Sequence, residues 1–228
     1  MNTGLDQYMD IFKDAVEDSA AKLTKSFEKI LIEVIILFMV IPRKINFTQM
    51  GRYGSHVEQT YRNAFGLKKS KSIDWLKLNV SLAKRFFGKQ GRWAIAIDPS
   101  YISKAGKKKL FFSTDTSLSG EEVLLYYRTR FHIEFCFRDA KGYTGLMDCQ
   151  ARDKWKLDFA FNASFTSLNV AKVTMKEMGM EYSMSSFKSL MTNIYLVKRI
   201  FKASGYTPNR TLISKIFKDL SCLQRIAA

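Results

Sequence analysis

Residues 126–141 read YYRTRFHIEFCFRDAK, and their spacing predicts a helix with one polar face. The polar side chains that define this face, at steps of three, four and seven positions, are Tyr127, Arg130, Glu134 and Lys141. A helix turns about 100° per residue, so these steps place the four side chains within a stripe roughly 60° wide. The apolar stripe beside it consists of Leu124, Phe131 and Phe135. We therefore expect a helix that is anchored on one side and presents four polar groups at the edge of a cavity.

The four polar side chains suit chemistry on phosphodiesters. A carboxylate such as Glu134 can hold a hard divalent cation through its oxygens. Arg130 and Lys141 can neutralise phosphates, and Tyr127 can stack on a base or donate a hydrogen bond. The alternative interpretation is an ordinary amphipathic helix with fortuitous salt bridges.

The pattern Y-x2-R-x3-E-x6-K resembles the YREK signature of bacterial DDE transposases of insertion-sequence family four. Two longer stretches, FSTDTSLSGEEVLLYYRTRFHIEFCFRDAKGYTGLMDCQARDKW (residues 112–155) and FNASFTSLNVAK (residues 161–172), are similar to that family as well. The resemblance covers most of the chain from about residue 46. It implies a cytoplasmic, nucleoid-associated enzyme that uses Mg²⁺ or Mn²⁺ to cut double-stranded transposon ends. It assigns metal binding and catalysis to Asp98 and Glu134, and DNA contacts to Tyr127, Arg130 and Lys141.

Asp98 follows a short apolar run, WAIAI at residues 93–97, and precedes a proline. This pattern predicts a buried strand with a carboxylate at its carboxyl end, and the alternative is a simple Asp-Pro turn. The resemblance places this strand first in a ribonuclease-H-like sheet. A second short strand is expected at residues 110–114, and Ser119 or Gly120 should open the helix that follows.

Only 35 residues separate Asp98 from Glu134, and this interval is too short for a complete catalytic core. A ribonuclease-H-like core needs four more strands and another helix there, about 31 residues before connections and beyond about 45 with them. The second aspartate of the DDE triad is missing, which indicates an internal deletion joined within residues 107–109. Asp115 is the one aspartate left in the interval, but it belongs to the FSTD segment, whose aspartate is not catalytic in the family.

The charge of the chain favours a polyanionic partner. The net charge is +16 over 228 residues. Residues 1–40 carry four basic and seven acidic side chains, a balance of −3, whereas residues 41–92 carry twelve basic and two acidic ones, a balance of +10. Such a basic block is typical of a nucleic-acid-binding surface, and the alternative is a merely soluble basic protein. Within it Trp75, Leu78 and Leu82 should pack inward while the surrounding lysines meet phosphates.

Residues 46–65, NFTQMGRYGSHVEQTYRNAF, predict a helix-turn-helix. Gly54 supplies the turn, and Ser55-x-x-Glu58 reads as a capping box that starts the second helix. Val57, Tyr61, Ala64 and Phe65 should then pack inward. The side chains expected to point outward, towards base edges in the major groove, are His56, Gln59, Arg62 and Asn63. The alternative is a helical hairpin that serves packing alone.

The sequence as a whole predicts a mostly helical protein with a small β remnant. We expect a DNA-binding region at residues 1–90, an incomplete ribonuclease-H-like core at 91–150 and a helical region at 151–228. Helices should cover residues 6–40, 159–176 and 185–203. The apolar run at residues 30–41 is too short to span a bilayer, which needs about 20 residues, so a buried or dimer-facing helix is expected. Three unpaired cysteines and two histidines make no zinc site.

Three functions are compatible with these observations. The chain could be a cut-and-paste transposase by descent, a non-catalytic DNA-binding relative, or a decayed remnant. The second would occupy transposon ends as a homodimer or in a mixed oligomer with the full-length enzyme, which it would inhibit. Metal-dependent strand cleavage separates the first function from the others, and end-specific, salt-sensitive binding separates the second from the third.

Overall fold

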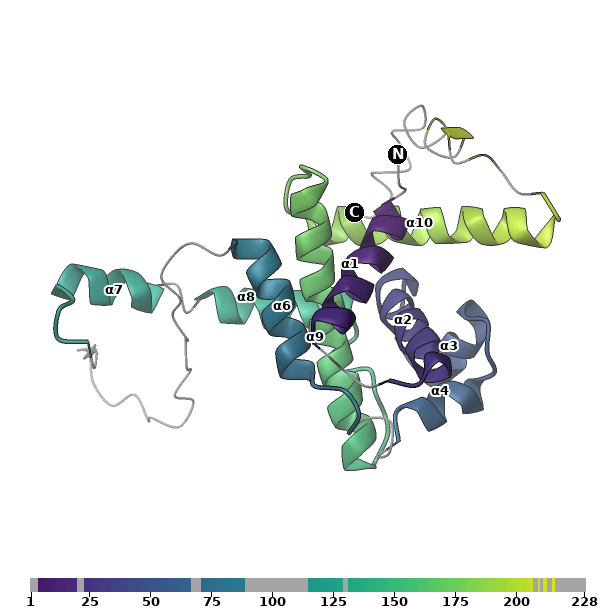
Figure 1. Ribbon diagram of the computed structural model, residues 1–228, viewed down its shortest axis with the longest axis horizontal. Helices are drawn as coiled ribbons and strands as arrows, with labels where there is room; N and C mark the ends of the chain where they lie inside the picture. Colours follow the sequence, from purple (N-terminus) through teal and green to yellow (C-terminus); the bar gives the residue numbers. More distant parts are fainter. Residues whose placement is uncertain are drawn as a thin grey trace. The chain divides into compact units, whose positions relative to one another are not determined.

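The computed structural model describes residues 4–19, 23–66, 71–88, 115–128 and 131–206, with a few single positions beyond. The chain divides into two compact units, Met1–Lys89 with Asp139–Ala228, and Gln90–Arg138. Every regular element in the described ranges is a helix, which confirms the mostly helical class (Figure 1). These helices are α1 (Gly4–Asp18), α2 (Lys25–Val40), α3 (Phe47–Tyr53), α4 (Glu58–Ala64), α6 (Trp75–Phe87), α7 (Gly120–Arg128), α8 (Phe131–Tyr143), α9 (Lys154–Glu177) and α10 (Met184–Ala203).

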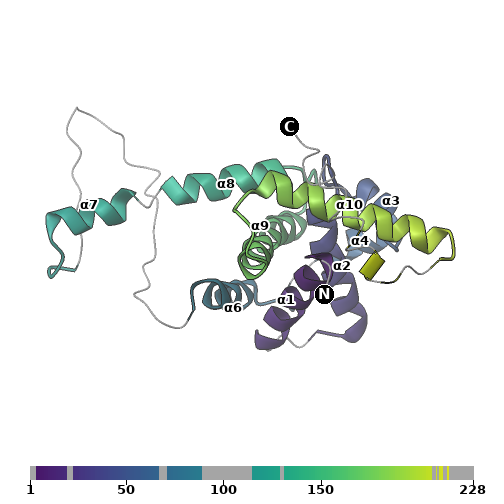
Figure 2. The ribbon, with the colours of Figure 1, turned by 90° about the horizontal axis from the view of Figure 1, so that it is seen from above.

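Helix α9 forms the centre of the first unit. It packs against α1, α2, α6 and α10, and Figure 2 shows it nearly end-on with these helices around it. Many of its buried residues are small, among them Ala160, Ala163, Ser164, Ser167 and Ala171. Small side chains let several helix backbones approach a central one closely, because each helix pair packs at a distance set by the side chains between them.

The buried hydroxyl groups of α9 all have hydrogen-bond partners. Ser167 donates to the carbonyl oxygen of Ile35 at 3.3 Å, and Thr174 donates to the carbonyl of Val170 at 2.7 Å. Thr166 accepts a hydrogen bond from the Asn79 amide at 3.0 Å. A central helix can therefore carry serine and threonine inside the core without leaving their polar atoms unsatisfied.

Local signals set most helix ends. The Asp153 carboxylate caps the start of α9 by accepting from the backbone N–H groups of Trp155 and Lys156 at 2.9 and 3.0 Å. Helix α9 ends before Gly179, whose φ of 63° a residue with a Cβ rarely adopts. The helices predicted at residues 159–176 and 185–203 are thus confirmed as α9 and α10, and the segment 6–40 forms α1 and α2.

The apolar run at residues 30–41 lies inside the first unit, as expected of a buried helix. Leu31, Val34, Ile35 and Leu37 on α2 have no exposed surface. In the described part of the chain, no helix is both long enough and apolar enough to cross a membrane.

The predicted β remnant falls outside the described residues. Both expected strands, at residues 93–97 and 110–114, lie there, and so does Asp98. The ribonuclease-H-like core therefore stays a prediction. Within the described part of the second unit, α7 starts with a true capping box: Ser119 N–H donates to Glu122 Oε2 at 2.8 Å, and Glu122 N–H donates to Ser119 Oγ at 3.2 Å. This confirms Ser119 as the residue that opens the helix.

Among the described lysines, Lys188 on α10 is the only one with less than a tenth of its surface exposed. Its side chain connects three helices. Its ammonium group donates to the carbonyl of Phe38 on α2 at 3.4 Å and to the carbonyl of Tyr143, the last residue of α8. Burial lowers the pKa of Lys188 to about 8, and the charge of Asp148 opposes this shift.

We expect the stability of the protein to rise with pH because of Lys188. Below the folded-state pKa, Lys188 is protonated in both states, and burial of its charge destabilises the folded state. Above that pKa the folded protein loses this proton while the unfolded chain keeps it, so the free energy of unfolding increases with pH. Between about pH 7 and pH 9.5 the free energy of unfolding should rise by about 2 kcal/mol from this group. The range stops there because tyrosines of an unfolded chain ionise near pH 10. Urea unfolding at several pH values measures the effect.

Two variants separate Lys188 from other titrating groups. Lys188→Met should remove the rise, whereas Lys202→Met, an exposed lysine on the same helix, should retain it. A rise of equal size in Lys188→Met would show that another group is responsible.

Candidate nucleic-acid interface

Helices α3 and α4 are joined by a short turn and pack against each other, so the two helices predicted at residues 46–65 are present; we call this pair the α3–α4 hairpin. Asn46 caps α3, since its Oδ1 accepts from the Gln49 backbone N–H at 2.9 Å. The turn at residues 54–57 is tight because the Tyr61 ring lies directly beneath it. A Cβ at Gly54 would collide with the Tyr61 hydroxyl, and this hydroxyl accepts from the His56 backbone N–H at 3.2 Å. Only glycine therefore fits at position 54.

The hairpin is fixed to the rest of its unit through its inner face. Tyr61, Ala64 and Phe65 are buried, as predicted. The Phe65 ring lies 4.1 Å from that of Phe159 on α9, centroid to centroid. Helix α10 holds the end of α3, because Tyr195 and Arg199 both donate to the carbonyl of Tyr53, the arginine at 2.6 Å. A DNA-reading element needs such a rigid support to keep its side chains in register.

Two details of the predicted hairpin are wrong. Ser55 does not cap α4, because its N–H and its hydroxyl both donate to the Glu33 carboxylate of α2, the N–H at 2.7 Å. Glu58 bonds instead to Thr48 and Arg62, and α4 begins at Glu58 without a side-chain cap. Val57 is 70% exposed rather than buried, since it lies in extended backbone before the helix and does not follow its periodicity.

The outward side of the hairpin carries the polar residues expected there. His56, Gln59 and Asn63 are exposed, and the Arg62 side chain is 42% exposed. Gln59 Nε2 donates to Asn63 Oδ1 at 2.9 Å, so two amide side chains lie one helical turn apart on α4. The carboxamides of Asn and Gln pair with adenine, and arginine pairs with guanine, in the major groove. This face could therefore read base edges.

Arg62 is held in place by two neighbours. Its guanidinium forms an ion pair with Glu58 on the same helix and lies over the Phe47 ring of α3, 4.9 Å from the centroid. The hydrogen bond from Arg62, with a second from Thr48, lowers the pKa of Glu58. The contacts with Glu58 and Phe47 orient the Arg62 guanidinium, and the lowered pKa favours the ionised form of Glu58.

Several exposed basic side chains lie within the hairpin or close to it in the sequence. Arg43, Lys44 and Arg52 are exposed, and Lys71 lies over the Trp155 ring at 5.1 Å from its centroid. Helix α6 buries Trp75, Leu78 and Leu82 as predicted. Arg85 on α6 binds Asp14 at 2.7 Å and Glu177 at 2.5 Å and so joins α6 to α1 and α9.

The residues of the YREK pattern lie on two described helices. Tyr127 is on α7, while Glu134 and Lys141 are exposed on α8. Arg130 lies outside the described residues, as does residue 129, so the single polar stripe stays a prediction. Asp115 accepts hydrogen bonds from the backbone and hydroxyl of Ser117 at 3.0 and 2.6 Å, which is the geometry of a turn residue.

No metal centre can be built from the described side chains. Within the described ranges, no group of three or more His, Cys, Asp or Glu residues lies together in a way that could hold an ion. Because Asp98 is outside those ranges, its predicted pairing with Glu134 stays a prediction.

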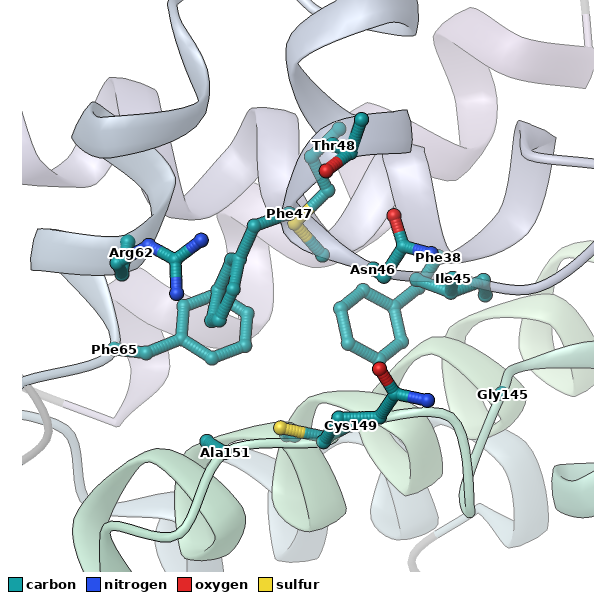
Figure 3. A pocket seen from close by; sticks show the side chains of 13 residues that line it. Phe38, Ile45, Asn46, Phe47, Thr48, Arg62, Phe65, Gly145, Cys149 and Ala151 are labelled. Carbon is teal, nitrogen blue, oxygen red and sulfur yellow. The ribbon is translucent and has the colours of Figure 1, made fainter.

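A pocket of about 300 Å³ opens beside the hairpin (Figure 3). Its apolar side chains include Phe38, Ile45, Phe47, Met50 and Phe65, and its polar ones include Asn46, Thr48, Arg62, Cys149 and Gln150. This pocket is not predictable from the sequence. Its walls come from residues 38–65 and 145–160, and no local pattern brings two such distant segments together.

Comparison with models of known protein families, with curated proteins and with solved structures finds no match to this chain.

Proposed function

We propose that this chain is a DNA-binding relative of the DDE transposases of insertion-sequence family four, and that it occupies transposon ends without cutting them. The observation that carries the proposal is the α3–α4 hairpin. It presents Gln59, Arg62 and Asn63 outward from a rigid support, within a segment that has a net charge of +10 over residues 41–92. The YREK resemblance supports the transposase descent.

In the proposed complex α4 enters the major groove. Gln59 and Asn63 offer amide groups to adenine edges and Arg62 offers its guanidinium to guanine. Exposed basic residues beside the hairpin, such as Arg43, Lys44 and Arg52, neutralise phosphates and set the register. His56 lies at the turn, with Nε2 at 3.6 Å from Glu33, and supplies a further contact at the edge of the face.

The second candidate is the active transposase, which the resemblance favours. In an active transposase, Asp98 and Glu134 would hold Mg²⁺ or Mn²⁺. The residues that would contact the DNA are Tyr127, Arg130 and Lys141. Two-metal strand transfer needs carboxylates that hold both ions. The 35 residues between Asp98 and Glu134 contain one aspartate, Asp115, that could stand for the missing second aspartate, and Asp115 serves a turn with Ser117. We therefore infer that the chain does not cut DNA, and that it binds transposon ends as a homodimer or beside an intact enzyme.

Arg62→Ala should weaken binding to a preferred duplex by about 1–3 kcal/mol, and binding to random duplex by less, if Arg62 makes a bidentate base contact. The preferred duplex is the one that the wild-type protein selects from a random library. Lys44→Ala, a basic residue just before α3, should weaken both duplexes alike. Fluorescence anisotropy measures the affinities of the wild type and of both variants for both duplexes. Equal losses on the two duplexes for Arg62→Ala would show that Arg62 contacts a phosphate rather than a base.

The purified chain should leave labelled transposon-end DNA uncut in Mg²⁺ or Mn²⁺. A lost metal ligand removes several kcal/mol of transition-state stabilisation, and each 1.36 kcal/mol is about tenfold in rate. Gel analysis should show the same background for wild type and Glu134→Ala. Cleavage that disappears in Glu134→Ala would contradict the proposal, and Asp115→Ala would then test Asp115 as the third ligand.

A further inference from the structure

The pocket beside the hairpin has the walls of a site for one flat aromatic ring. Phe47 and Phe65 meet edge to face, with centroids 5.0 Å apart, and Phe38 and Met50 complete the apolar lining. At about 300 Å³ the pocket lies at the small end of ligand sites, which favours a single planar group over an extended molecule. Figure 3 shows the Phe47 and Phe38 rings on two sides of the space, with Cys149 below.

A positively charged, planar group stands at the same pocket. The Arg62 guanidinium lines the wall and lies over the Phe47 ring. An arginine in this position can stack on an aromatic ring and also donate hydrogen bonds to a negatively charged phosphate. The ligand therefore combines a flat ring with an attached anion.

Polar groups around the pocket can meet the edge of such a ring. The Asn46 oxygen is committed to the Gln49 N–H at 2.9 Å, so Asn46 offers its NH₂ group. Thr48 contributes a hydroxyl and Gln150 an exposed carboxamide. Donors and acceptors set around an apolar floor are what a nucleobase edge requires.

Arg62 connects the pocket to the DNA-reading face, because it belongs to both. We propose that the pocket takes one unstacked nucleobase from a DNA strand bound at the α3–α4 hairpin, with Phe47 as the stacking surface and Arg62 at the wall beside the base. This inference rests on the proposed DNA binding, since the hairpin delivers the strand. A single-stranded end supplies such a base without breaking a base pair.

The test compares two short duplexes with single-stranded overhangs of equal length. One overhang carries bases and the other is abasic, so the two carry the same phosphates. Stacking of a base on an aromatic side chain makes the base-bearing duplex bind about fivefold to 150-fold more tightly. Fluorescence anisotropy measures both dissociation constants on the full-length protein.

Cys149 provides an independent readout inside the pocket. The chain has three cysteines, so Cys136→Ser with Cys222→Ser leaves Cys149 as the single thiol. The base-bearing duplex should slow alkylation of Cys149 by iodoacetamide, and the abasic duplex should leave it nearly unchanged. This measurement is made on a protein whose pocket residues are all native.

A substitution then assigns the stacking surface. Phe47→Leu keeps an apolar side chain but removes the ring, so it should reduce binding of the base-bearing duplex to the level of the abasic one. Phe161→Leu, an exposed phenylalanine of α9 outside the pocket, should leave the difference intact.

The outcomes separate this inference from the function on which it rests. Equal affinity for both duplexes, with Cys149 equally reactive in both complexes, would overturn the nucleobase site while DNA binding by the hairpin stands. Failure of both duplexes to bind would remove the proposed function and the nucleobase site together. A tighter base-bearing complex that leaves Cys149 reactive would place the base elsewhere and also overturn the inference.

Discussion

Raising the salt concentration from about 50 to about 200 mM should weaken binding of this chain to duplex DNA by about a thousandfold to a hundred-thousandfold, if it neutralises about six to ten phosphates. The effect is large because each neutralised phosphate releases condensed counterions. The charge of +10 on residues 41–92 supplies the cations, and the acidic residues 1–40 carry −3. Residues 93–228 carry the remaining +9, so the segment that contains the hairpin supplies about half of the excess positive charge.

The salt dependence is measured by fluorescence anisotropy over a series of salt concentrations. A plot of log affinity against log salt should be linear, with a slope of about −0.9 for each phosphate contacted. Lys44→Ala should reduce the slope by about one contact, whereas Lys202→Ala on α10 should leave it unchanged. A nearly flat plot would mean that the net charge of +16 serves no nucleic acid.

Phe159→Ala should lower the free energy of unfolding by about 3–5 kcal/mol. Phe159 has no exposed surface, and its ring joins Phe65 at 4.1 Å and Trp75 at 5.3 Å between centroids. The substitution leaves a cavity where α9 meets α4 and α6, and well-packed cores relax only partly into such cavities. The hairpin loses its main support at the same time.

Urea unfolding followed by circular dichroism gives the loss in stability. Phe161→Ala is the matched control, because Phe161 lies two residues away on α9 and is 45% exposed. It should change stability by less than about 1 kcal/mol. A loss of that small size in Phe159→Ala would contradict the central position of this aromatic cluster.

Local chemistry explains why most helices could be predicted. Gly179 and Gly205 stop α9 and α10 through backbone angles that other residues avoid, and Pro42 follows the end of α2. The α3–α4 hairpin was recognisable for the same reason, since Gly54 marks the turn and the buried Tyr61 and Phe65 follow helical spacing. Each of these signals acts within a few residues.

Contacts between distant segments explain the failures. Ser55 has a glutamate three residues on and still makes no capping box, because Glu33, 22 residues earlier, captures both its donors. Arg85 joins three helices, because Asp14 on α1 and Glu177 on α9 both approach it on α6. Burial of Lys188 likewise depends on carbonyls from α2 and α8. None of these partners has a signature near the residue it binds.

The candidate site was predictable in its residues but not in its shape. The exposure of Gln59 and Asn63 follows from helix periodicity on α4, whereas His56 is exposed in the turn before that helix. The pocket did not, because Phe47 and Arg62 meet the loop around Cys149 only through tertiary folding.

Amide hydrogen exchange with and without duplex DNA tests the central claim most directly. The account predicts slower exchange in the DNA complex at residues 46–66, which contain α3, the turn and α4, and no comparable change along α1. Arg62→Ala should reduce this protection on the preferred duplex. Protection confined to other helices, with residues 46–66 exchanging as in the free protein, would contradict the assignment of the hairpin as the DNA-binding surface.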